Sequence, residues 1–484
     1  MSITTVIDHK LFNELKKISR EQTINLFDLN GKFTEVVSAS ICKFLIPIGL
    51  FSSSIPLKVP ISLTTNNIIS NHENIILPKL YPLQKKVVNE VLSRMKKKII
   101  EKRSLYMTLH LACGFGKTIT SCYLIAVHKR KTIICVPNKM LINQWKNAIS
   151  NINISYKISI DGVQKLLKEL NNEQQYDVLI IVSRHLSNEQ FCKYIYEKYD
   201  TFILDESHTY NLMNESTVTK FLTFYPPKIC YFLTATPRRV NRIYCNDLIN
   251  IEKVSDLTKK INVIENFFEP YYTDTIRQLI KKLTPEYNKY HMYTEKILCE
   301  DTPRNSLIIT TITNAFKNNN INRVLIVTKL RKHMLLIYNK LLEIFNNDII
   351  FLGDAKNKNT HEIVKQIKTM EKFIFISTTH YAGTGLDIPS LDSLVICSAV
   401  MNAMQMEQIL GRICRDTELK NRSVYVFPNT SIREIKHSVG LYAQKLILLA
   451  CEKLGFEKHV PIITHPKVEL ALFKALNQQI HQGL

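Results

Sequence analysis

The sequence T-F-I-L-D-E-S-H, residues Thr201–His208, places two carboxylates directly after a short apolar run. Such a run is typical of a strand that is buried on both faces of a parallel sheet. Asp205 and Glu206 would then lie at the carboxyl end of the strand, where α/β sheets bind ligands. One carboxylate can hold Mg²⁺ while its neighbour orients and deprotonates a water molecule. Adjacent Asp and Glu residues are also common on solvated turns, so this pattern alone leaves both interpretations open.

A second segment, A-C-G-F-G-K-T at Ala112–Thr118, lies between an expected strand at Leu105–Leu111 and an expected helix from Ile119. A glycine-rich loop between a strand and a helix is the context that a phosphate-binding loop requires. The strict loop pattern has glycine at position 111, where this chain has leucine. The alternative is a glycine-bearing surface turn, which the strand before it and the helix after it disfavour.

Four residues of this loop have separate expected roles. Gly114 and Gly116 allow backbone N–H groups to approach a phosphate closely, and the dipole of the following helix favours its negative charge. Lys117 can reach the β- and γ-phosphates of a nucleotide, and the Thr118 hydroxyl can ligate Mg²⁺. The loop is completed by Ala112, Cys113 and Phe115.

Apolar, strand-like runs recur along the chain with helical segments between them, which predicts parallel sheets flanked by helices. The runs of a first block are Leu105–Leu111, Thr132–Pro137, Asp177–Val182, Thr201–Leu204 and Ile229–Leu233, the last of which leads into T-A-T-P at Thr234–Pro237. The runs of a second block are Arg323–Thr328, Asp348–Leu352, Lys372–Ser377, Ser393–Ser398 and Ser423–Phe427. The sequence therefore predicts an α/β protein with two tandem parallel-sheet domains.

The second block has no phosphate loop of its own, but it carries two other motifs. G-T-G-L-D occupies Gly383–Asp387, and Q-I-L-G-R-I-C-R occupies Gln408–Arg415 on an expected helix. Arg412 and Arg415 are three residues apart, so they would share a helix face. Two such arginines suggest fingers aimed at a γ-phosphate bound by the neighbouring domain. The alternative is a pair of solvated arginines.

Composition narrows the class of protein. A hydrophobic content of 45% and a charged content of 22% over 484 residues indicate a globular, multidomain chain. We find no apolar run of membrane-spanning length and no signal peptide, so we expect a soluble intracellular protein. The eleven cysteines form no C-x-x-C pair, and we expect reduced thiols without a zinc or iron–sulfur site. The net charge of +22 favours a polyanionic partner, although it also fits a lysine-rich surface.

The remaining regions carry no chemical motif. Phe44–Phe51 is expected to be a core segment, with a partner-binding surface as the alternative. The expected division is an N-terminal accessory domain at 1–78, a first domain at 79–255, a linker or insert at 256–304, a second domain at 305–430 and a helical C-terminal extension at 431–484.

Taken together, the motifs resemble those of superfamily 2 helicases. L-Y-P-L-Q (Leu80–Gln84), A-C-G-F-G-K-T, D-E-S-H, T-A-T-P, G-T-G-L-D and Q-x-x-G-R-x-x-R occur in the order that this superfamily uses. Longer stretches, such as I-C-V-P-N-K-M-L-I-N-Q-W-K and Y-F-L-T-A-T-P-R, look like the poxvirus family of DNA helicases that act as transcript release factors. The resemblance implies two RecA-like domains.

The resemblance also implies residue roles. Gln84 would contact adenine, Lys117 the phosphates, and Thr118 with Asp205 the Mg²⁺ of bound ATP, while Glu206 would be the general base. The coupling residues between ATP and nucleic acid would be His208, Thr234 and Thr236. Asp387 would meet the ribose, and the γ-phosphate would face Gln408, Arg412 and Arg415.

The biology implied by the resemblance is DNA-stimulated ATP hydrolysis, unwinding with 3′–5′ polarity and release of nascent RNA. The implied partners are single-stranded and duplex DNA, RNA or an RNA–DNA hybrid, and the viral RNA polymerase elongation complex with other viral factors. The implied locations are the virion and the viral factory in the host cytoplasm. Two alternatives stay open: a duplex translocase or remodeller that does not separate strands, and a non-catalytic virion or polymerase-binding scaffold.

Overall fold

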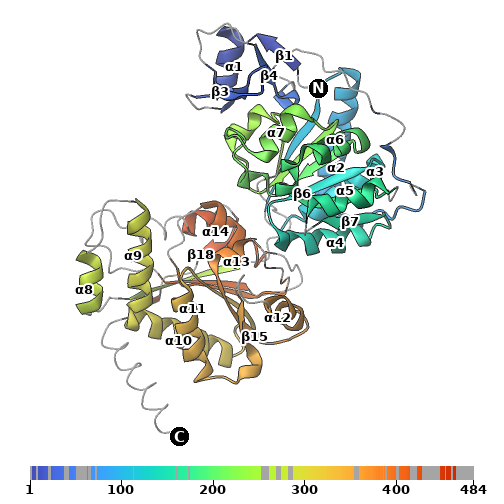
Figure 1. Ribbon diagram of the computed structural model, residues 1–484. Coiled ribbons are helices and arrows are strands. Elements are labelled where there is room, and N and C mark those ends of the chain that lie inside the picture. Colours follow the sequence, from blue (N-terminus) through green and yellow to red (C-terminus); the bar gives the residue numbers. More distant parts are fainter. Residues whose placement is uncertain are drawn as a thin grey trace. The chain divides into compact units, whose positions relative to one another are not determined.

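The computed structural model divides into two compact units, Met1–Glu252 and Lys253–Leu484, each described here by itself (Figure 1). The structure describes residues 3–6, 9–19, 23–36, 43–50, 63, 67–70, 73–112, 114–159, 162–172, 175–251, 261–268, 274–281, 287–353, 359–384, 386, 388, 390–398, 403–414, 422–427, 447–452, 454–458 and 462–464.

Unit 1 is built on a parallel sheet of seven strands in the order β11-β5-β10-β9-β6-β8-β7. Their bounds are β5 (Leu105–Leu111), β6 (Thr132–Val136), β7 (Tyr156–Ser159), β8 (Val178–Val182), β9 (Thr201–Leu204), β10 (Ile229–Thr234) and β11 (Leu248–Ile251). The helices are α1 (His9–Ser19), α2 (Pro82–Ile100), α3 (Lys117–His128), α4 (Ile142–Ser150), α5 (Val163–Asn171), α6 (Glu189–Lys198) and α7 (Thr217–Phe224).

The five strands expected from apolar runs in the first block are confirmed, and every residue of these strands is buried. The two additional strands, β7 and β11, lie at the two edges of the sheet and are only partly buried. A strand that is exposed along one side needs fewer apolar residues, so these two gave no apolar run.

Helices cover both faces of this sheet. On one face, the hydroxyl of Tyr231 in β10 contacts His128 of α3 at 2.7 Å and Met95 of α2 at 2.9 Å. On the other face, Phe202 of β9 packs on Phe221 of α7 with ring centroids 4.9 Å apart. This layering buries both faces of the central strands, as a parallel sheet requires.

The N-terminal segment packs on the second of these faces. Its described elements are α1, the antiparallel pair β1 (Ile3–Val6) and β4 (Lys43–Ile46), and the antiparallel pair β2 (Asn25–Phe27) and β3 (Phe33–Glu35). Phe12 and Ile46 belong to the same hydrophobic cluster as Tyr106 of β5 and Tyr244. The described part of the expected domain 1–78 thus shares the core of unit 1, and the core interpretation of Phe44–Phe51 holds for its described residues.

Unit 2 contains a second parallel sheet, in the order β14-β15-β13-β16-β17-β12-β18, with β19 also paired to β12. Its strands are β12 (Ile261–Phe268), β13 (Arg323–Thr328), β14 (Ile350–Gly353), β15 (Phe373–Thr378), β16 (Ser393–Ile396), β17 (Arg422–Val426), β18 (Glu457–Lys458) and β19 (Ile462–Thr464). Its helices are α8 (Asp274–Lys281), α9 (Tyr287–Glu300), α10 (Thr302–Lys317), α11 (Arg331–Leu342), α12 (Thr360–Ile367), α13 (Thr379–Thr384) and α14 (Ala403–Leu410). The predicted class, two parallel-sheet α/β domains, is therefore confirmed.

Two regions of unit 2 differ from the expectation. Residues 256–304, expected as a linker or insert, contribute β12, which pairs with β17 inside the sheet. This strand was missed because it buries Glu265 and Asn266, which interrupt its apolar pattern. The C-terminal extension, expected to be helical, is helical at residues 447–452, but its described residues also contribute β18 and β19 to the same sheet.

No helix in the described part of the chain is long and apolar enough to cross a membrane. The nine cysteines that the structure describes are all free thiols.

Candidate nucleotide-binding site

Strand order brings three of the sequence motifs to one edge of the first sheet. β10 lies between β5 and β9, and all three strands run in parallel. The loop Ala112–Thr118 follows β5, D-E-S-H follows β9, and T-A-T-P follows β10. The carboxyl ends of adjacent parallel strands share an edge, so these segments converge there.

The glycine-rich loop has the backbone that a phosphate-binding loop requires. Gly114 and Gly116 have φ angles of +80° and +86°, in the left-handed region that favours glycine. Helix α3 begins at Lys117 directly after Gly116, so its first N–H groups point into the loop. Cys113 lies outside the described residues, and Ala112 and Phe115 are buried.

Gln84 supports this loop from the first turn of α2. Its side-chain amide donates a hydrogen bond to the carbonyl of Phe115 at 2.7 Å, and its Oε1 accepts one from the backbone N–H of Tyr81 at 2.9 Å. A side chain at Gly116 would place its Cβ 2.5 Å from Gln84 Nε2. Gln84 is therefore a brace of the loop, and contact with adenine stays a prediction.

Two consecutive residues of α4 bind the two expected Mg²⁺ ligands. Gln144 Nε2 donates to the Thr118 hydroxyl at 2.8 Å, and Trp145 Nε1 donates to Asp205 Oδ2 at 2.7 Å. A hydroxyl and a carboxylate are oxygen donors of the kind that Mg²⁺ prefers, and outer hydrogen bonds that fix such ligands are typical of metal sites. The donor set thus fits Mg²⁺. The sequence alone assigned no role to Gln144 or Trp145, because their link to Thr118 and Asp205 is purely spatial.

The surroundings of Asp205 control its proton. Burial, followed by the neighbouring charge of Glu206, raises the pKa of this carboxyl, whereas the Trp145 hydrogen bond and Lys117 lower it. Asp205 Oδ1 also accepts the backbone N–H of Glu206 at 2.9 Å. A cation at this carboxylate would favour the ionised form by the same electrostatic reasoning.

Glu206 is held in an uncommon backbone conformation at the start of the D-E-S-H turn. Its φ and ψ are 46° and 49°, a left-handed conformation that a non-glycine residue adopts only when its surroundings enforce it. Its Oε2 lies 3.3 Å from Nδ1 of His208. The same His208 nitrogen is 3.1 Å from the hydroxyl of Thr234. His208 thus connects Glu206 to the T-A-T-P segment.

The proton affinity of His208 is set by the same cluster. Burial lowers the pKa of His208, and Lys117 and Arg238 lower it further, while Glu206 acts in the opposite direction. Thr234 also accepts the backbone N–H of Thr236 at 3.0 Å. The Thr236 hydroxyl is buried and makes no hydrogen bond with the residues that the structure describes. The three predicted coupling residues therefore lie in one cluster with Glu206.

The arginine motif of unit 2 differs in part from its prediction. Helix α14 ends at Leu410, and Arg412 lies in the following turns, so the motif is not one continuous helix. Arg412 donates from Nε to the carbonyl of Ala382 at 3.0 Å and from Nη2 to the carbonyl of Gly383. Gln408 of α14 lies near Gly383. Arg415 and Asp387 lie outside the described residues.

Comparisons with known proteins agree with this geometry. The family model "Type III restriction enzyme, res subunit" matches residues 77–239, and "Helicase conserved C-terminal domain" matches residues 305–417. "Transcript termination protein A18" of Yaba monkey tumor virus (strain VR587) is 63% identical over 480 residues, which are 99% of this chain and 100% of the relative. The chain belongs to the poxvirus transcript termination protein family, within the superfamily 2 helicases.

Other members of the transcript termination family show the same relationship. The A18 protein of Myxoma virus (strain Lausanne) is 57% identical over 481 residues, 99% of this chain and 100% of the relative. "Transcript termination protein OPG145" of Variola virus is 58% identical over 458 residues, 93% of this chain and 92% of the relative. The match along nearly the whole chain includes the N- and C-terminal regions, which lie outside the two helicase models.

Solved structures support the fold. An "ATP-dependent Type ISP restriction-modification enzyme LlaBIII bound to DNA" aligns with a TM-score of 0.57 at 14% identity, over 84% of this chain and 33% of that chain. A fragment of an HsdR subunit of a type I restriction enzyme from Vibrio vulnificus YJ016 aligns with a TM-score of 0.52 at 12% identity, over 82% of this chain and 72% of that chain. At these identities the likeness concerns architecture alone.

Proposed function

We propose that this protein is a nucleic-acid-stimulated ATPase and DNA helicase that uses ATP hydrolysis to release nascent RNA from viral transcription complexes. The observation that carries the proposal is the shared edge of the first sheet, where the glycine-rich loop, Thr118, Asp205 and Glu206 converge. A helicase-type factor in transcript termination is what the family membership gives. Hydrolysis, unwinding and 3′–5′ polarity are the proposed steps beyond it.

In the proposed reaction, the loop N–H groups and Lys117 bind the β- and γ-phosphates. Thr118 and Asp205 would hold the Mg²⁺ of MgATP, which would neutralise charge on the phosphate oxygens. Glu206 orients the attacking water and accepts its proton, and its Oε2 lies 3.3 Å from Nδ1 of His208. His208 contacts both Glu206 and Thr234, so a change in the position or charge of Glu206 is transmitted to the T-A-T-P segment.

We propose that residues of unit 2 complete the reaction. Arg412 and Arg415 stabilise the γ-phosphate with Gln408, and Asp387 binds the ribose. Comparable arginine fingers contribute about 10³ to 10⁵ in rate. Because Arg412 is bonded to the backbone of α13, this role requires those two hydrogen bonds to be exchanged for contacts to phosphate during the cycle.

The proposed partners follow from charge and family. A net charge of +22 supports contacts to the phosphates of single-stranded or duplex DNA, RNA or an RNA–DNA hybrid, with steep salt dependence. The relatives' name supports action on the viral RNA polymerase elongation complex with other viral factors. The proposed locations are the virion and the viral factory in the host cytoplasm.

The decisive measurement is steady-state ATP hydrolysis with and without single-stranded DNA or RNA, next to a Glu206→Gln variant. We expect stimulation by nucleic acid in the wild type and its loss in the variant. Absence of hydrolysis by protein that binds ATP would contradict the proposal. A strand-displacement assay then separates unwinding from translocation, since hydrolysis without displacement would identify a remodeller that does not separate strands.

A further inference from the structure

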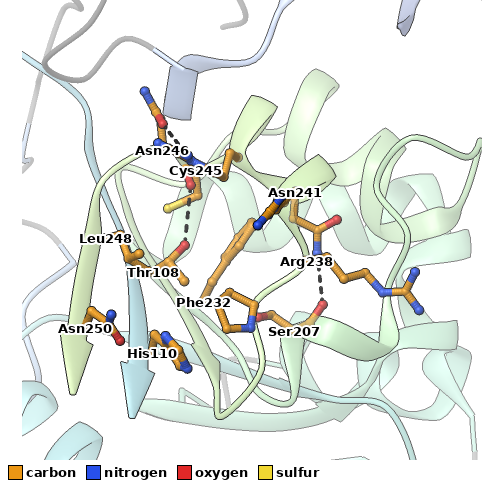
Figure 2. A pocket seen from close by; sticks show the side chains of 13 residues that line it. Thr108, His110, Ser207, Phe232, Arg238, Asn241, Cys245, Asn246, Leu248 and Asn250 are labelled. Atoms are coloured by element: carbon orange, nitrogen blue, oxygen red, sulfur yellow. Dashed lines mark hydrogen bonds between the residues drawn. The ribbon is translucent and has the colours of Figure 1, made fainter. Parts of the chain in front are cut away.

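Unit 1 contains a cavity that the nucleotide site does not use. It has a volume of about 220 Å³ and lies beside the edge strand β11, between β5 and the short helix η6 (Arg239–Ile243) (Figure 2). Thr108 and His110 of β5 form one wall with their register partners Leu248 and Asn250 of β11. A cavity of this size can hold several water molecules, so it can accept a group as large as a phosphate.

The other wall of the cavity is strongly basic. It carries Arg238, Arg239 and Arg242, three arginines within five consecutive residues. Arg239 and Arg242 are exposed, and Arg242 Nε donates to Asn246 Oδ1 at 3.2 Å, which orients its guanidinium at the rim. A planar guanidinium matches the oxygens of a phosphate in a two-pronged geometry.

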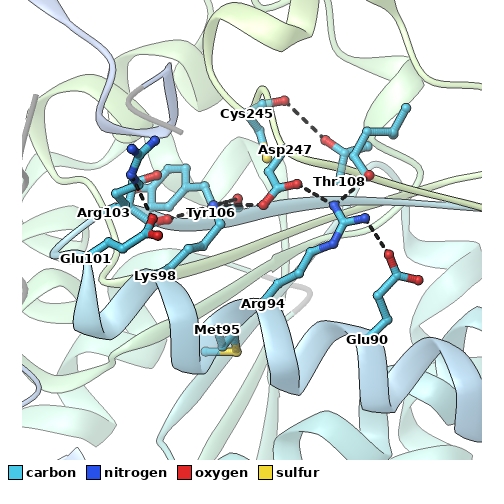
Figure 3. Close-up of polar contacts among 12 residues, drawn as sticks. Glu90, Arg94, Met95, Lys98, Glu101, Arg103, Tyr106, Thr108, Cys245 and Asp247 are labelled. Carbon is cyan, nitrogen blue, oxygen red and sulfur yellow. Dashed lines mark hydrogen bonds and ion pairs between the residues drawn. The ribbon is translucent and has the colours of Figure 1, made fainter. Parts of the chain in front are cut away.

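No described residue that lines the cavity carries a carboxylate, and the one acid in the lining segment 245–250 is held elsewhere. Asp247 faces α2, where its two oxygens lie 2.7 Å from Arg94 Nη1 and 2.9 Å from Lys98 Nζ (Figure 3). Its charge is therefore compensated by α2 and does not offset the arginines. The described lining of the cavity therefore carries positive charge without a carboxylate of its own, which favours an anion.

The basic wall is also joined directly to the D-E-S-H turn. The Arg238 guanidinium donates from Nε to the carbonyl of His208. Asn241 of η6 donates to the carbonyl of Ser207 at 3.1 Å and to that of Tyr210 at 3.0 Å. A phosphate that draws the arginine wall inward would therefore act on the backbone that positions His208 and its neighbour Glu206.

We propose that this cavity is a phosphate-binding site, in which Arg239 and Arg242 hold a phosphate group and Arg238 links its occupancy to the D-E-S-H turn. The phosphate belongs either to the backbone of a nucleic-acid strand or to a small compound such as pyrophosphate. The link to hydrolysis rests on the proposed ATPase function, whereas the binding itself does not.

Binding is tested in full-length protein that carries Lys117→Ala, so that the glycine-rich loop contributes little to the measured binding of phosphate groups. The affinity for a short fluorescent oligothymidylate is measured by anisotropy over a range of salt concentrations, with and without Arg239→Ala/Arg242→Ala. Loss of two phosphate contacts should lower the slope of log affinity against log salt by about 1.4, at about 0.7 per contact. At low salt we expect the double variant to bind the oligothymidylate about tenfold more weakly, because two phosphate contacts are lost.

The matched control is Lys165→Ala/Lys168→Ala, which removes two exposed positive charges from α5 of the same unit. We expect this control to keep the wild-type slope. Equal losses of slope in the two double variants would reduce the oligothymidylate result to general charge loss and rule out a nucleic-acid strand as the source of the phosphate. The Arg239→Lys/Arg242→Lys variant keeps the charge but not the fork geometry, and it should recover only part of the affinity.

The same proteins are titrated with pyrophosphate by calorimetry to identify the source of the phosphate. Arginine-dependent binding of oligothymidylate supports a nucleic-acid strand, and arginine-dependent binding of pyrophosphate alone supports a small phosphate compound. If neither probe depends on Arg239 and Arg242, the proposal is wrong.

The link to hydrolysis is tested with Arg238→Gln in otherwise wild-type protein. Oligothymidylate should still bind, but the ratio of stimulated to unstimulated hydrolysis should fall towards one, and Arg238→Lys should restore part of it. Full stimulation in Arg238→Gln would overturn the link. Complete absence of hydrolysis in the wild type would instead contradict the proposed ATPase and leave the binding result standing.

Discussion

Trp145 donates its indole N–H to Asp205 Oδ2 across 2.7 Å, and both side chains are buried. This contact joins the only tryptophan of the chain to the carboxylate that we assign to Mg²⁺. The indole N–H holds Asp205 in one orientation and lowers the pKa of its carboxyl, which burial raises. The contact therefore provides both a structural support for the metal site and a natural optical reporter of its state.

We expect the intrinsic fluorescence of Trp145 to change when MgADP binds. A cation at Asp205 withdraws electron density from the carboxylate that accepts the indole N–H, and the emission of the indole depends on that hydrogen bond. The measurement is a titration of tryptophan emission against MgADP, with Asp205→Asn as a variant that should lose the response. An unchanged spectrum in wild-type protein that is saturated by an independent binding assay would contradict the assignment.

Removal of the supporting donors should raise the Mg²⁺ requirement. Trp145→Phe leaves Asp205 without its side-chain donor, and Gln144→Ala does the same for Thr118. Loss of such outer partners typically costs about 10- to 100-fold in metal affinity. The readout is the Mg²⁺ concentration that half-saturates ATP hydrolysis. Lys146→Ala, on the exposed side of the same helix, should leave this value unchanged.

Gly116→Ala should abolish tight nucleotide binding for two separate reasons. The new Cβ would lie 2.5 Å from Gln84 Nε2, and the φ of +86° is strained for any side chain. Left-handed backbone costs a non-glycine residue about 1–2 kcal/mol, which alone is about tenfold in affinity. The measurement is the dissociation constant of a fluorescent ADP analogue.

The double variant Gln84→Ala/Gly116→Ala separates these two causes. It relieves the collision with the Gln84 amide but keeps the unfavourable φ and loses the brace on the Phe115 carbonyl. We expect it to bind nucleotide no better than Gln84→Ala alone. Recovery to wild-type affinity would show that the collision was the whole effect.

The central strands were predictable because each is buried on both faces and reads as a continuous apolar run. β5, β9 and β13 match their predicted bounds. β12 was not predictable in this way, because Glu265 and Asn266 break its pattern, and its pairing with β17 bridges more than 150 residues of sequence.

The residues of the candidate site likewise fall into those that the sequence predicts and those that only the structure reveals. Lys117, Asp205 and Glu206 follow strands in recognisable motifs, so the sequence was sufficient to propose them. The roles of Gln144, Trp145 and Arg238 depend on side-chain contacts between elements far apart in the chain, such as α4 with the turn after β9. A sequence pattern describes periodicity along one element and carries no record of such contacts.

The stability of unit 2 should depend on pH through His333 of α11. This side chain is fully buried, and its Nε2 lies 2.8 Å from Asn305 Oδ1, which can only accept a hydrogen bond. Burial, with a smaller effect of Arg304, lowers the pKa of His333 to about 3. A lowered pKa means that the folded state excludes the proton, so the stabilisation is present above the unfolded pKa of about 6.5 and is lost as pH falls below it.

Between pH 7 and pH 5 this exclusion should cost about 2 kcal/mol of unfolding free energy, since each unit of pH below the unfolded pKa costs about 1.4 kcal/mol. Asp301, whose pKa burial raises to about 6, acts in the opposite direction. The overall slope of stability against pH therefore underestimates the contribution of His333.

His333→Gln keeps a donor for Asn305 but cannot titrate. The protection of α11 amides in hydrogen exchange should therefore fall less between pH 7 and pH 5, after correction for intrinsic exchange, in this variant than in wild type. The exposed His380 of α13 provides the control, because His380→Gln should preserve the wild-type dependence. If protection of the α11 amides depends equally on pH in His333→Gln and in wild type, exclusion of the proton from His333 does not contribute to the stability of unit 2, and the prediction is wrong.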